Sequence, residues 1–145
     1  MATINPYLTF DGTCEEAFEF YKTIFGREFQ FSGRFSEMPP NPEMPEMSEE
    51  DKNKIMHISL PISSETVLMG SDVINGDDLV KGNNCTISIH CDTIQEVDQM
   101  FLGLSNGGKV TMPLNKTFWG SYFGMFTDKY GIHWMISCQN GEKPA

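Results

Sequence analysis

The same pattern of hydrophobic and polar positions occurs twice along the chain. Residues 13–16 and 93–96 share the motif T-x-x-E, and each motif is followed by apolar residues at helical spacing. In such a capping box the threonine hydroxyl accepts a backbone N–H hydrogen bond, and the glutamate reaches back to the helix start. Glycines follow both stretches, as is common after a helix. The pattern therefore predicts two capped helices, at residues 14–25 and 94–105.

Strand patterns surround both predicted helices. Runs of alternating apolar and polar residues, with the two-residue period of an extended chain, precede each helix once and follow it three times. The expected strands cover residues 4–10, 28–35, 55–62 and 66–71 in the first half, and 85–91, 109–112, 121–127 and 132–138 in the second. We therefore predict an α+β fold, in which two βαβββ modules form a curved mixed sheet with the helices on its convex side.

Length and composition fit one domain. A chain of 145 residues, 39% of them hydrophobic, supplies enough apolar side chains for one core. We expect a single domain over residues 1–145, with module one at about 4–72, a linker at about 73–84, and module two at about 85–138. Two such halves that face each other would enclose a cleft, the kind of place where small molecules bind.

Residues 36–54 interrupt the strand pattern. This stretch is rich in proline and acidic residues and contains Met38, Met44 and Met47. Proline neither donates to a sheet ladder nor continues a helix, so a long loop is expected. Three roles stay open for this loop: a lid over an apolar ligand, an arm that contacts a partner subunit, or a mobile loop without a binding role.

The polarity of alternate strand positions indicates which residues face the cleft. All three histidines fall on the less apolar side of their strands. Because the apolar side must lie beneath the helices, the other side is expected to line the concave face. The candidate ligand-binding residues, one of them on a loop beside this face, are Tyr7, His57, Ser59, Met69, Ser88, Trp119, Phe123, Met125 and Met135. The alternative is that these side chains only fill the space between two sheets.

His57 is the ionisable side chain expected in the middle of the pocket wall. Imidazole is the usual proton carrier near neutral pH, which makes His57 the candidate catalytic residue, with a hydrogen-bonded structural role as the alternative. Trp119 could stack on a planar ligand or close a dimer interface, where aromatic residues are enriched. Tyr7 could orient a ligand or hydrogen-bond a backbone group.

Charge and cysteine content exclude several function classes. A formal net charge of −10 without a Lys/Arg cluster argues against nucleic acid as a partner and would attract a cationic small molecule. The alternative is that the acidic surface only keeps the protein in solution. No apolar run approaches the roughly 20 residues of a membrane span, and the first residues lack a signal-peptide pattern. The cysteines show no C-x-x-C spacing and are expected to be small buried hydrophobes. We therefore expect a cytoplasmic protein with no membrane partner.

Several segments carry a family resemblance that spans residues 4–138. They are residues 6–10, 20–26, 54–57, 108–114, 117–120 and 123–131. These segments, and the duplicated βαβββ order, resemble the PhnB-like branch of the vicinal oxygen chelate superfamily, which includes glyoxalase I, extradiol dioxygenases and bleomycin-resistance proteins. The resemblance implies a homodimer of paired βαβββ modules. Some PhnB-like proteins are labelled ubiquinone methyltransferases, but this sequence has no glycine-rich nucleotide-binding loop.

The resemblance also implies where a metal would bind. Enzymes of this superfamily hold a divalent ion through the first and last strand of each module, and those positions fall here at about Asn5, Met69, Thr86 and Met135. Such ions prefer imidazole and carboxylate ligands, which none of the four provides. His90 and His133 lie at opposite ends of neighbouring parallel strands, more than about 10 Å apart, so a three-histidine site is not expected. We predict no metal and no other cofactor.

Three functional hypotheses follow. The first is a metal-free, dimeric protein that binds a small apolar or aromatic ligand, possibly a cation, in its concave cavity. The second is a divalent-metal-dependent enzyme of the glyoxalase or dioxygenase type with a displaced site. The third is a protein in which the dimer interface alone matters. The sequence shows no Ser/His/Asp or Cys/His arrangement for nucleophilic catalysis, and it leaves open whether any reaction is catalysed.

Overall fold

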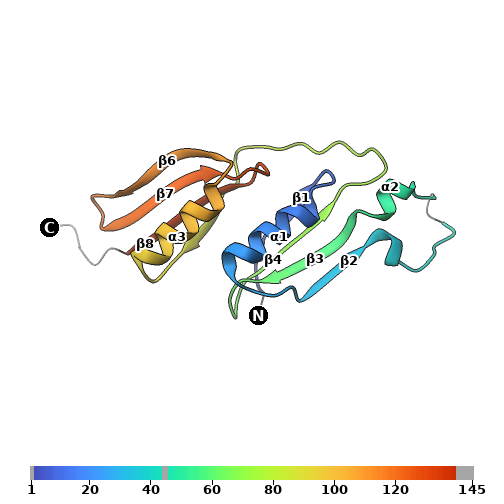
Figure 1. Ribbon diagram of the computed structural model, residues 1–145, viewed down its shortest axis with the longest axis horizontal. Coiled ribbons are helices and arrows are strands. Elements are labelled where there is room, and N and C mark those ends of the chain that lie inside the picture. The colour runs from blue at the N-terminus through green and yellow to red at the C-terminus, as the bar shows by residue number, and fades with distance from the viewer. Residues whose placement is uncertain (1, 44–45, 140–145) are drawn as a thin grey trace. The chain divides into compact units, whose positions relative to one another are not determined.

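The chain forms two compact units, Met1–Val80 and Lys81–Ala145, termed the first and the second unit. Figure 1 shows them in a computed structural model that describes residues 2–43 and 46–139. Each unit has one four-stranded sheet and one twelve-residue helix. No helix in the described part of the chain is long and apolar enough to cross a membrane. That the two units share one domain stays a prediction.

The first unit has the order βαβββ with two short helical turns inserted. Its elements are β1 (Tyr7–Phe10), α1 (Cys14–Phe25), β2 (Phe31–Arg34), the 3-10 turn η1 (Phe35–Glu37), α2 (Glu49–Lys52), β3 (Ile55–Pro61) and β4 (Val67–Asp72). The strand order across the sheet is β1-β4-β3-β2. Strand β1 runs parallel to β4, whereas the β4–β3 and β3–β2 pairs are antiparallel.

The second unit repeats this topology. Its elements are β5 (Ile87–His90), α3 (Ile94–Ser105), β6 (Lys109–Lys116), β7 (Ser121–Thr127) and β8 (His133–Gln139). The sheet order is β5-β8-β7-β6, again with a parallel first pair and two antiparallel pairs. The predicted α+β fold of two βαβββ modules with mixed sheets is therefore confirmed.

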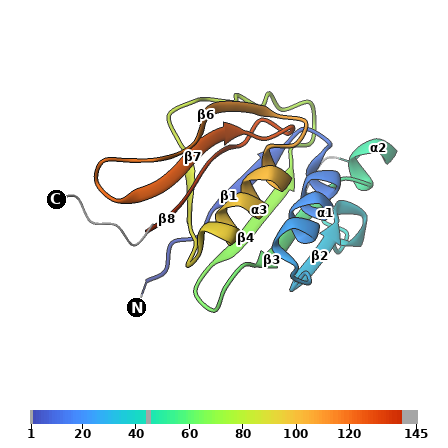
Figure 2. The same ribbon diagram turned by 60° about the vertical axis from the view of Figure 1, so that its left-hand side comes forward.

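Each long helix covers one face of the sheet in its own unit (Figures 1 and 2). In the first unit, Ala17, Phe18 and Tyr21 of α1 are fully buried. Gly70 of β4 lies directly under α1, because a Cβ atom there would be 2.7 Å from the Phe18 ring. In the described part of the first unit, no helix covers the opposite face of the sheet.

The second unit has the same close approach of helix and sheet. Val97, Phe101 and Leu104 of α3 are buried, and a Cβ atom on Gly124 of β7 would be 2.7 Å from the Phe101 ring. Trp134 of β8 is 1% exposed and completes this core. A glycine at the centre of each sheet thus lets a helical aromatic ring rest on the strand backbone.

A buried carboxylate joins three parts of the first unit. Asp72, at the end of β4 and 5% exposed, accepts hydrogen bonds from the backbone N–H groups of Gly12 and Cys14 at Oδ1, at 2.9 and 3.0 Å. Its Oδ2 accepts from Ile55 N at 2.9 Å. One side chain therefore fixes the β1–α1 turn and the start of β3 to the end of β4.

The first predicted capping box does not form. Thr13 occupies the N-cap position of α1, but its side chain makes no capping hydrogen bond within the described residues. Asp72 satisfies the Cys14 N–H instead. The second box is formed in part, since Thr93 Oγ1 accepts from Glu96 N at 3.1 Å and also contacts the Glu96 carboxylate. At α1, a residue distant in sequence therefore takes the place of the local cap, whereas α3 keeps its own threonine cap.

Strand boundaries differ from the sequence prediction at several places. Strand β1 is shorter than residues 4–10, β2 is shorter than residues 28–35, and β5 is shorter than residues 85–91. Strand β6 continues through Pro113 to Lys116, because it is an edge strand where proline is tolerated. The expected loop at 36–54 contains the last two residues of η1 and all of α2, and Met44 and Pro45 lie outside the described residues.

A bulge in β3 overturns part of the predicted face assignment. Gly33 pairs with His57 whereas Arg34 pairs with Ile55, so β3 has one extra residue, Met56. Ile55 is therefore buried at 1% exposure and Met56 is half-buried, whereas strict alternation with His57 on the open side would bury Met56. Because a bulge shifts the alternation by one residue, strand periodicity alone could not assign both residues correctly.

The two threonines give a paired test of capping. We expect Thr93→Ala to lower the free energy of unfolding by about 1 kcal/mol, because it removes a cap hydrogen bond. Thr13→Ala should change it by less than about 0.5 kcal/mol. Urea denaturation followed by circular dichroism measures both. Equal losses in the two variants would contradict the assignment of the cap of α1 to Asp72.

Asp72→Asn tests the buried carboxylate. The amide nitrogen cannot accept a hydrogen bond, so at least one buried N–H loses its acceptor. We expect the free energy of unfolding to fall by about 2–4 kcal/mol. The matched control is Asp77→Asn in an exposed loop, which should have an effect below about 0.5 kcal/mol. If both variants unfold at the same urea concentration, Asp72 does not have the role assigned to it.

Candidate functional site

The face of the first sheet opposite α1 carries a row of four side chains. Strand register aligns them across the sheet in the order Tyr7, Met69, Ser59 and Phe31. A pocket of about 490 Å³ lies on this face. Its lining residues are Asn5, Gln30, Phe31, His57, Ser59, Val67 and Met69. The structure thus brings three of the predicted site residues, His57, Ser59 and Met69, into one pocket.

His57 is the centre of an aromatic cluster at this pocket. Its ring centroid lies 5.7 Å from that of Tyr7 and 5.9 Å from that of Phe31, with interplanar angles of 26° and 36°. The Tyr7 hydroxyl and His57 Nδ1 form a hydrogen bond of 3.2 Å. Tyr7 and Phe31 are each 48% exposed, so the cluster is accessible from solvent.

Sequence reasoning missed four of the pocket residues. Asn5, Gln30, Phe31 and Val67 line the pocket but were not site candidates. Phe31 could have been included, since strand alternation places Phe29, Phe31 and Phe35 on one face of the predicted strand at 28–35. What the sequence could not supply was the β2–β3 register, which places Phe31 opposite Ser59.

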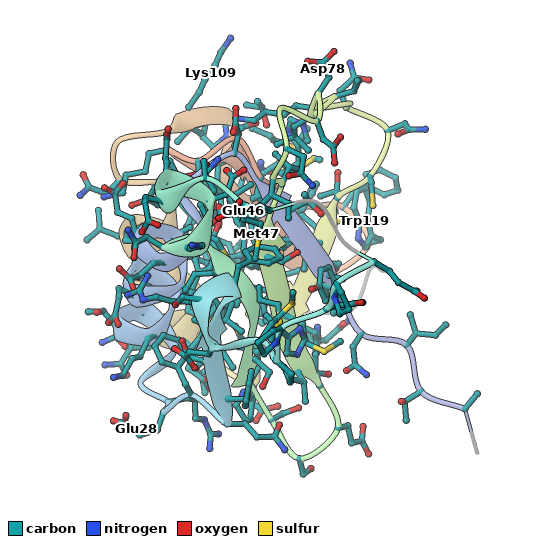
Figure 3. The ribbon with its side chains drawn as sticks, turned by 90° about the vertical axis from the view of Figure 1, so that its right-hand side faces the viewer. Glu28, Glu46, Met47, Asp78, Lys109 and Trp119 are labelled. Carbon is teal, nitrogen blue, oxygen red and sulfur yellow. The ribbon has the colours of Figure 1, made fainter. Side chains whose placement is uncertain are left out.

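The other sheet candidates lie on the corresponding face of the second unit. Register aligns Ser88, Met135 and Met125 across β5, β8 and β7. Phe123 follows in the next row, and the Trp119 ring centroid lies 6.2 Å from the Phe123 ring. Trp119, which is labelled in Figure 3, lies on the loop between β6 and β7 and is 51% exposed. That the two sets of residues share one cavity stays a prediction.

The other two histidines do not assemble a metal site. His133 contacts Thr127 Oγ1 through Nδ1 at 2.9 Å and the Gly82 carbonyl oxygen through Nε2 at 3.1 Å. His90 pairs with Ser137, four residues beyond His133 along β8, so the two rings lie on different rows. Among residues 2–43 and 46–139, no group of three or more His, Cys, Asp or Glu side chains could hold a metal ion.

The four positions at which the family resemblance implies metal ligands do not fit a divalent ion. Met69 and Met135 offer thioethers, and Thr86 offers a neutral hydroxyl. The Asn5 side-chain oxygen already accepts a hydrogen bond from Val67 N at 2.9 Å, beside β4. Divalent ions of this chemistry take imidazole and carboxylate ligands. The donor set is therefore unsuited to the metal chemistry of the superfamily.

The buried cysteines lie in surroundings that disfavour their thiolate forms. Burial, with a contribution from Asp72, raises the pKa of the Cys14 thiol far above its ordinary value, and burial raises that of Cys91 to about 11. Burial likewise raises the pKa of Cys138. A thiol becomes a nucleophile as its thiolate, which these environments disfavour at neutral pH. The expectation that cysteines are buried is confirmed for these three, whereas Cys85 is exposed.

A second pocket, of about 550 Å³, lies within the Pro- and Met-rich loop of the first unit. Its lining includes Phe35, Met38 and Met47, and Met47 is labelled in Figure 3. The loop is anchored at α2, where the Asn75 N–H and the Lys54 ammonium hold the pKa of Asp51 below its usual range. The choice among lid, partner arm and mobile loop stays open.

A family model matches most of the chain, and several known proteins are similar to it. The model of the glyoxalase/bleomycin resistance protein/dioxygenase superfamily matches residues 3–136. The crystal structure of protein PA1353 from Pseudomonas aeruginosa is 37% identical, with a TM-score of 0.83 over 96% of this chain and 98% of that one. The PhnB protein from Bacillus cereus is 25% identical, with a TM-score of 0.74 over 94% and 99%. Protein YjdN from Escherichia coli (strain K12) is 29% identical over 92% of this chain and 93% of its own length.

Proposed function

Because the chain belongs to the glyoxalase/bleomycin resistance protein/dioxygenase superfamily, with a PhnB protein among its structural neighbours, we propose that it is a PhnB-like ligand-binding protein. It functions without a metal and as a homodimer. It binds a small apolar or aromatic molecule on the face of its first sheet opposite α1, termed the open face. The single observation that carries this proposal is the pocket centred on His57 and Phe31.

The composition of the pocket supports an aromatic ligand. Phe31, Val67 and Met69 give it an apolar surface, while His57 and Gln30 add a few polar groups. This combination is typical of small-molecule sites. The rings of Phe31 and His57 offer stacking partners, and offset or tilted ring pairs add about 0.5–1.5 kcal/mol beyond burial. A formal net charge of −10 favours a neutral or cationic ligand over an anion.

The donor set argues for the metal-free hypothesis over the alternative of a divalent-metal-dependent enzyme. The superfamily metal positions hold amide, thioether and hydroxyl groups, as described above. A protein that only binds an organic molecule does not need the imidazole and carboxylate groups that these positions lack. His57 remains the candidate for proton transfer if the bound molecule reacts.

Exposed apolar side chains support the dimer. Val110 and Met112 on the edge strand β6 are 44% and 39% exposed, and Phe118 and Trp119 on the following loop are 85% and 51% exposed. A group of exposed apolar and aromatic residues is a common feature of protein interfaces. We propose that the partner is a second copy of this chain.

The thiols support a cytoplasmic location. Cys14, Cys85, Cys91 and Cys138 are all free. Reducing compartments keep thiols in this state, whereas exported proteins commonly use cysteines in disulfides.

Ligand binding is tested with fluorene, a planar aromatic hydrocarbon, by isothermal titration calorimetry. Phe31→Ala should weaken binding about tenfold, because it removes an aromatic wall of the pocket. The control Leu102→Ala, on the exposed side of α3, should leave affinity unchanged. Metal content is measured by plasma mass spectrometry on the same sample, purified without chelator. Stoichiometric nickel, zinc, iron or manganese, or equal binding by both variants, would contradict the proposal.

The dimer is tested by light scattering at micromolar concentration. The chain mass is 16.4 kDa, and we expect a particle of about twice that value. Phe118→Ser should shift the equilibrium toward the monomer, because it removes an exposed aromatic contact. Leu102→Ser, a matched change at another exposed apolar residue, should not. A wild-type mass near that of one chain would refute the dimer.

A further inference from the structure

We propose that His57 presents an N–H donor at Nε2 to an acceptor oxygen of a planar aromatic ligand, and that Tyr7 is the positioning residue that fixes this proton. This inference deepens the proposed function and rests on it, since it concerns the same pocket. It defines the ligand class as an aromatic molecule that carries a carbonyl or comparable oxygen.

The geometry separates the roles of the two residues. His57 lines the pocket, and the lining in the described part of the chain does not include Tyr7. Tyr7 reaches His57 from β1, on the far side of β4, and its hydroxyl lies 3.2 Å from Nδ1. With Nδ1 engaged, Nε2 is the imidazole nitrogen left for a ligand, because no other described residue hydrogen-bonds it.

The direction of the Tyr7–His57 hydrogen bond follows from the two groups. A phenol is a more acidic donor than a neutral imidazole N–H, and an imidazole nitrogen is a better acceptor than a phenol oxygen. The Tyr7 O–H therefore donates to Nδ1. A neutral imidazole carries one proton, and the hydrogen bond at one nitrogen sets where it is. That proton is placed on Nε2, which becomes a donor.

The orientation of the aromatic rings limits how a ligand can approach the Nε2 N–H of His57. Tyr7, His57 and Phe31 form a row with interplanar angles of 26° and 36° along it, so the rings are closer to parallel than to perpendicular. Phe31 and His57 share the pocket. A flat ligand that packs against Phe31 can thus direct an edge oxygen toward the imidazole edge.

Asn5 and Ser59, two of the other polar residues that line the pocket, do not replace His57, and the third, Gln30, is exposed. The Asn5 amide already hydrogen-bonds Val67 N through its oxygen and Thr3 Oγ1 through its nitrogen, at 2.9 and 3.4 Å. Ser59 lines the pocket but is only 5% exposed. His57 is half-buried, so a ligand can reach its ring, and its proton is fixed on Nε2.

The test compares 9-fluorenone with fluorene, two planar probes of nearly equal size that differ by one carbonyl oxygen. We expect wild-type protein to bind fluorenone about fivefold more tightly, the usual value of one net hydrogen bond. His57→Phe should remove this preference while keeping an aromatic ring. Tyr7→Phe should reduce it although the phenol does not line the pocket. Tyr122→Phe is the matched control, because it removes a phenol that hydrogen-bonds Asp98 in the second unit.

A second readout is spectroscopic. Nitrogen-15 NMR of the His57 ring should show the proton on Nε2 in the wild type and a mixture of tautomers in Tyr7→Phe. A merely structural role of Tyr7 would leave the tautomer unchanged, and that result would overturn the inference. Equal affinity of the wild type for both probes would overturn the inference and leave the proposed function intact. Failure of both probes to bind would overturn both.

Discussion

The buried carboxylate of Asp72 is the interaction on which the first unit depends. It accepts hydrogen bonds from backbone N–H groups of the β1–α1 turn and of the start of β3, and so fixes both segments to the end of β4. In the second unit, the buried Asp128 directly follows β7, the counterpart of β3 in sheet order, and accepts hydrogen bonds from Tyr130 N, Ile132 N and the Trp134 indole. Each unit thus uses one aspartate, less than 6% exposed, to close a corner of its sheet. Buried N–H groups are costly without an acceptor, so these carboxylates determine which strand ends can meet.

Function follows from the face that this arrangement leaves open. With α1 held against Gly70, no helix in the part of this unit that the structure describes covers the other face of the first sheet. Strands β1 and β3 both pair with β4, and the hydrogen bonds of Asp72 hold the ends of these strands together. This pairing brings Tyr7 of β1 within hydrogen-bonding distance of His57 of β3. The proposed binding site is therefore a consequence of the packing of the opposite face. Superfamily membership is compatible with this site, but the superfamily metal positions in this chain carry the wrong donors.

The sequence predicted the elements better than the contacts between them. Both long helices have the bounds that their periodicity indicated, because an amphipathic helix is a local pattern. The cap of α1 and the bulge at Met56 could not be predicted, since each is decided by a residue or strand distant in sequence. The same limit applies to the site. Alternation placed His57, Ser59 and Met69 on one face, whereas the contribution of Phe31 depends on strand register.

The central claim is that a planar aromatic ligand binds on the open face of the first sheet. NMR of protein labelled with carbon-13 in the methionine methyl groups tests it most directly, because Met69 lines the pocket while Met100 lies on α3 beside Cys91. On titration with fluorene, the account predicts a saturable shift of the Met69 methyl resonance and no shift for Met100. Binding of fluorene that leaves Met69 unmoved would contradict it.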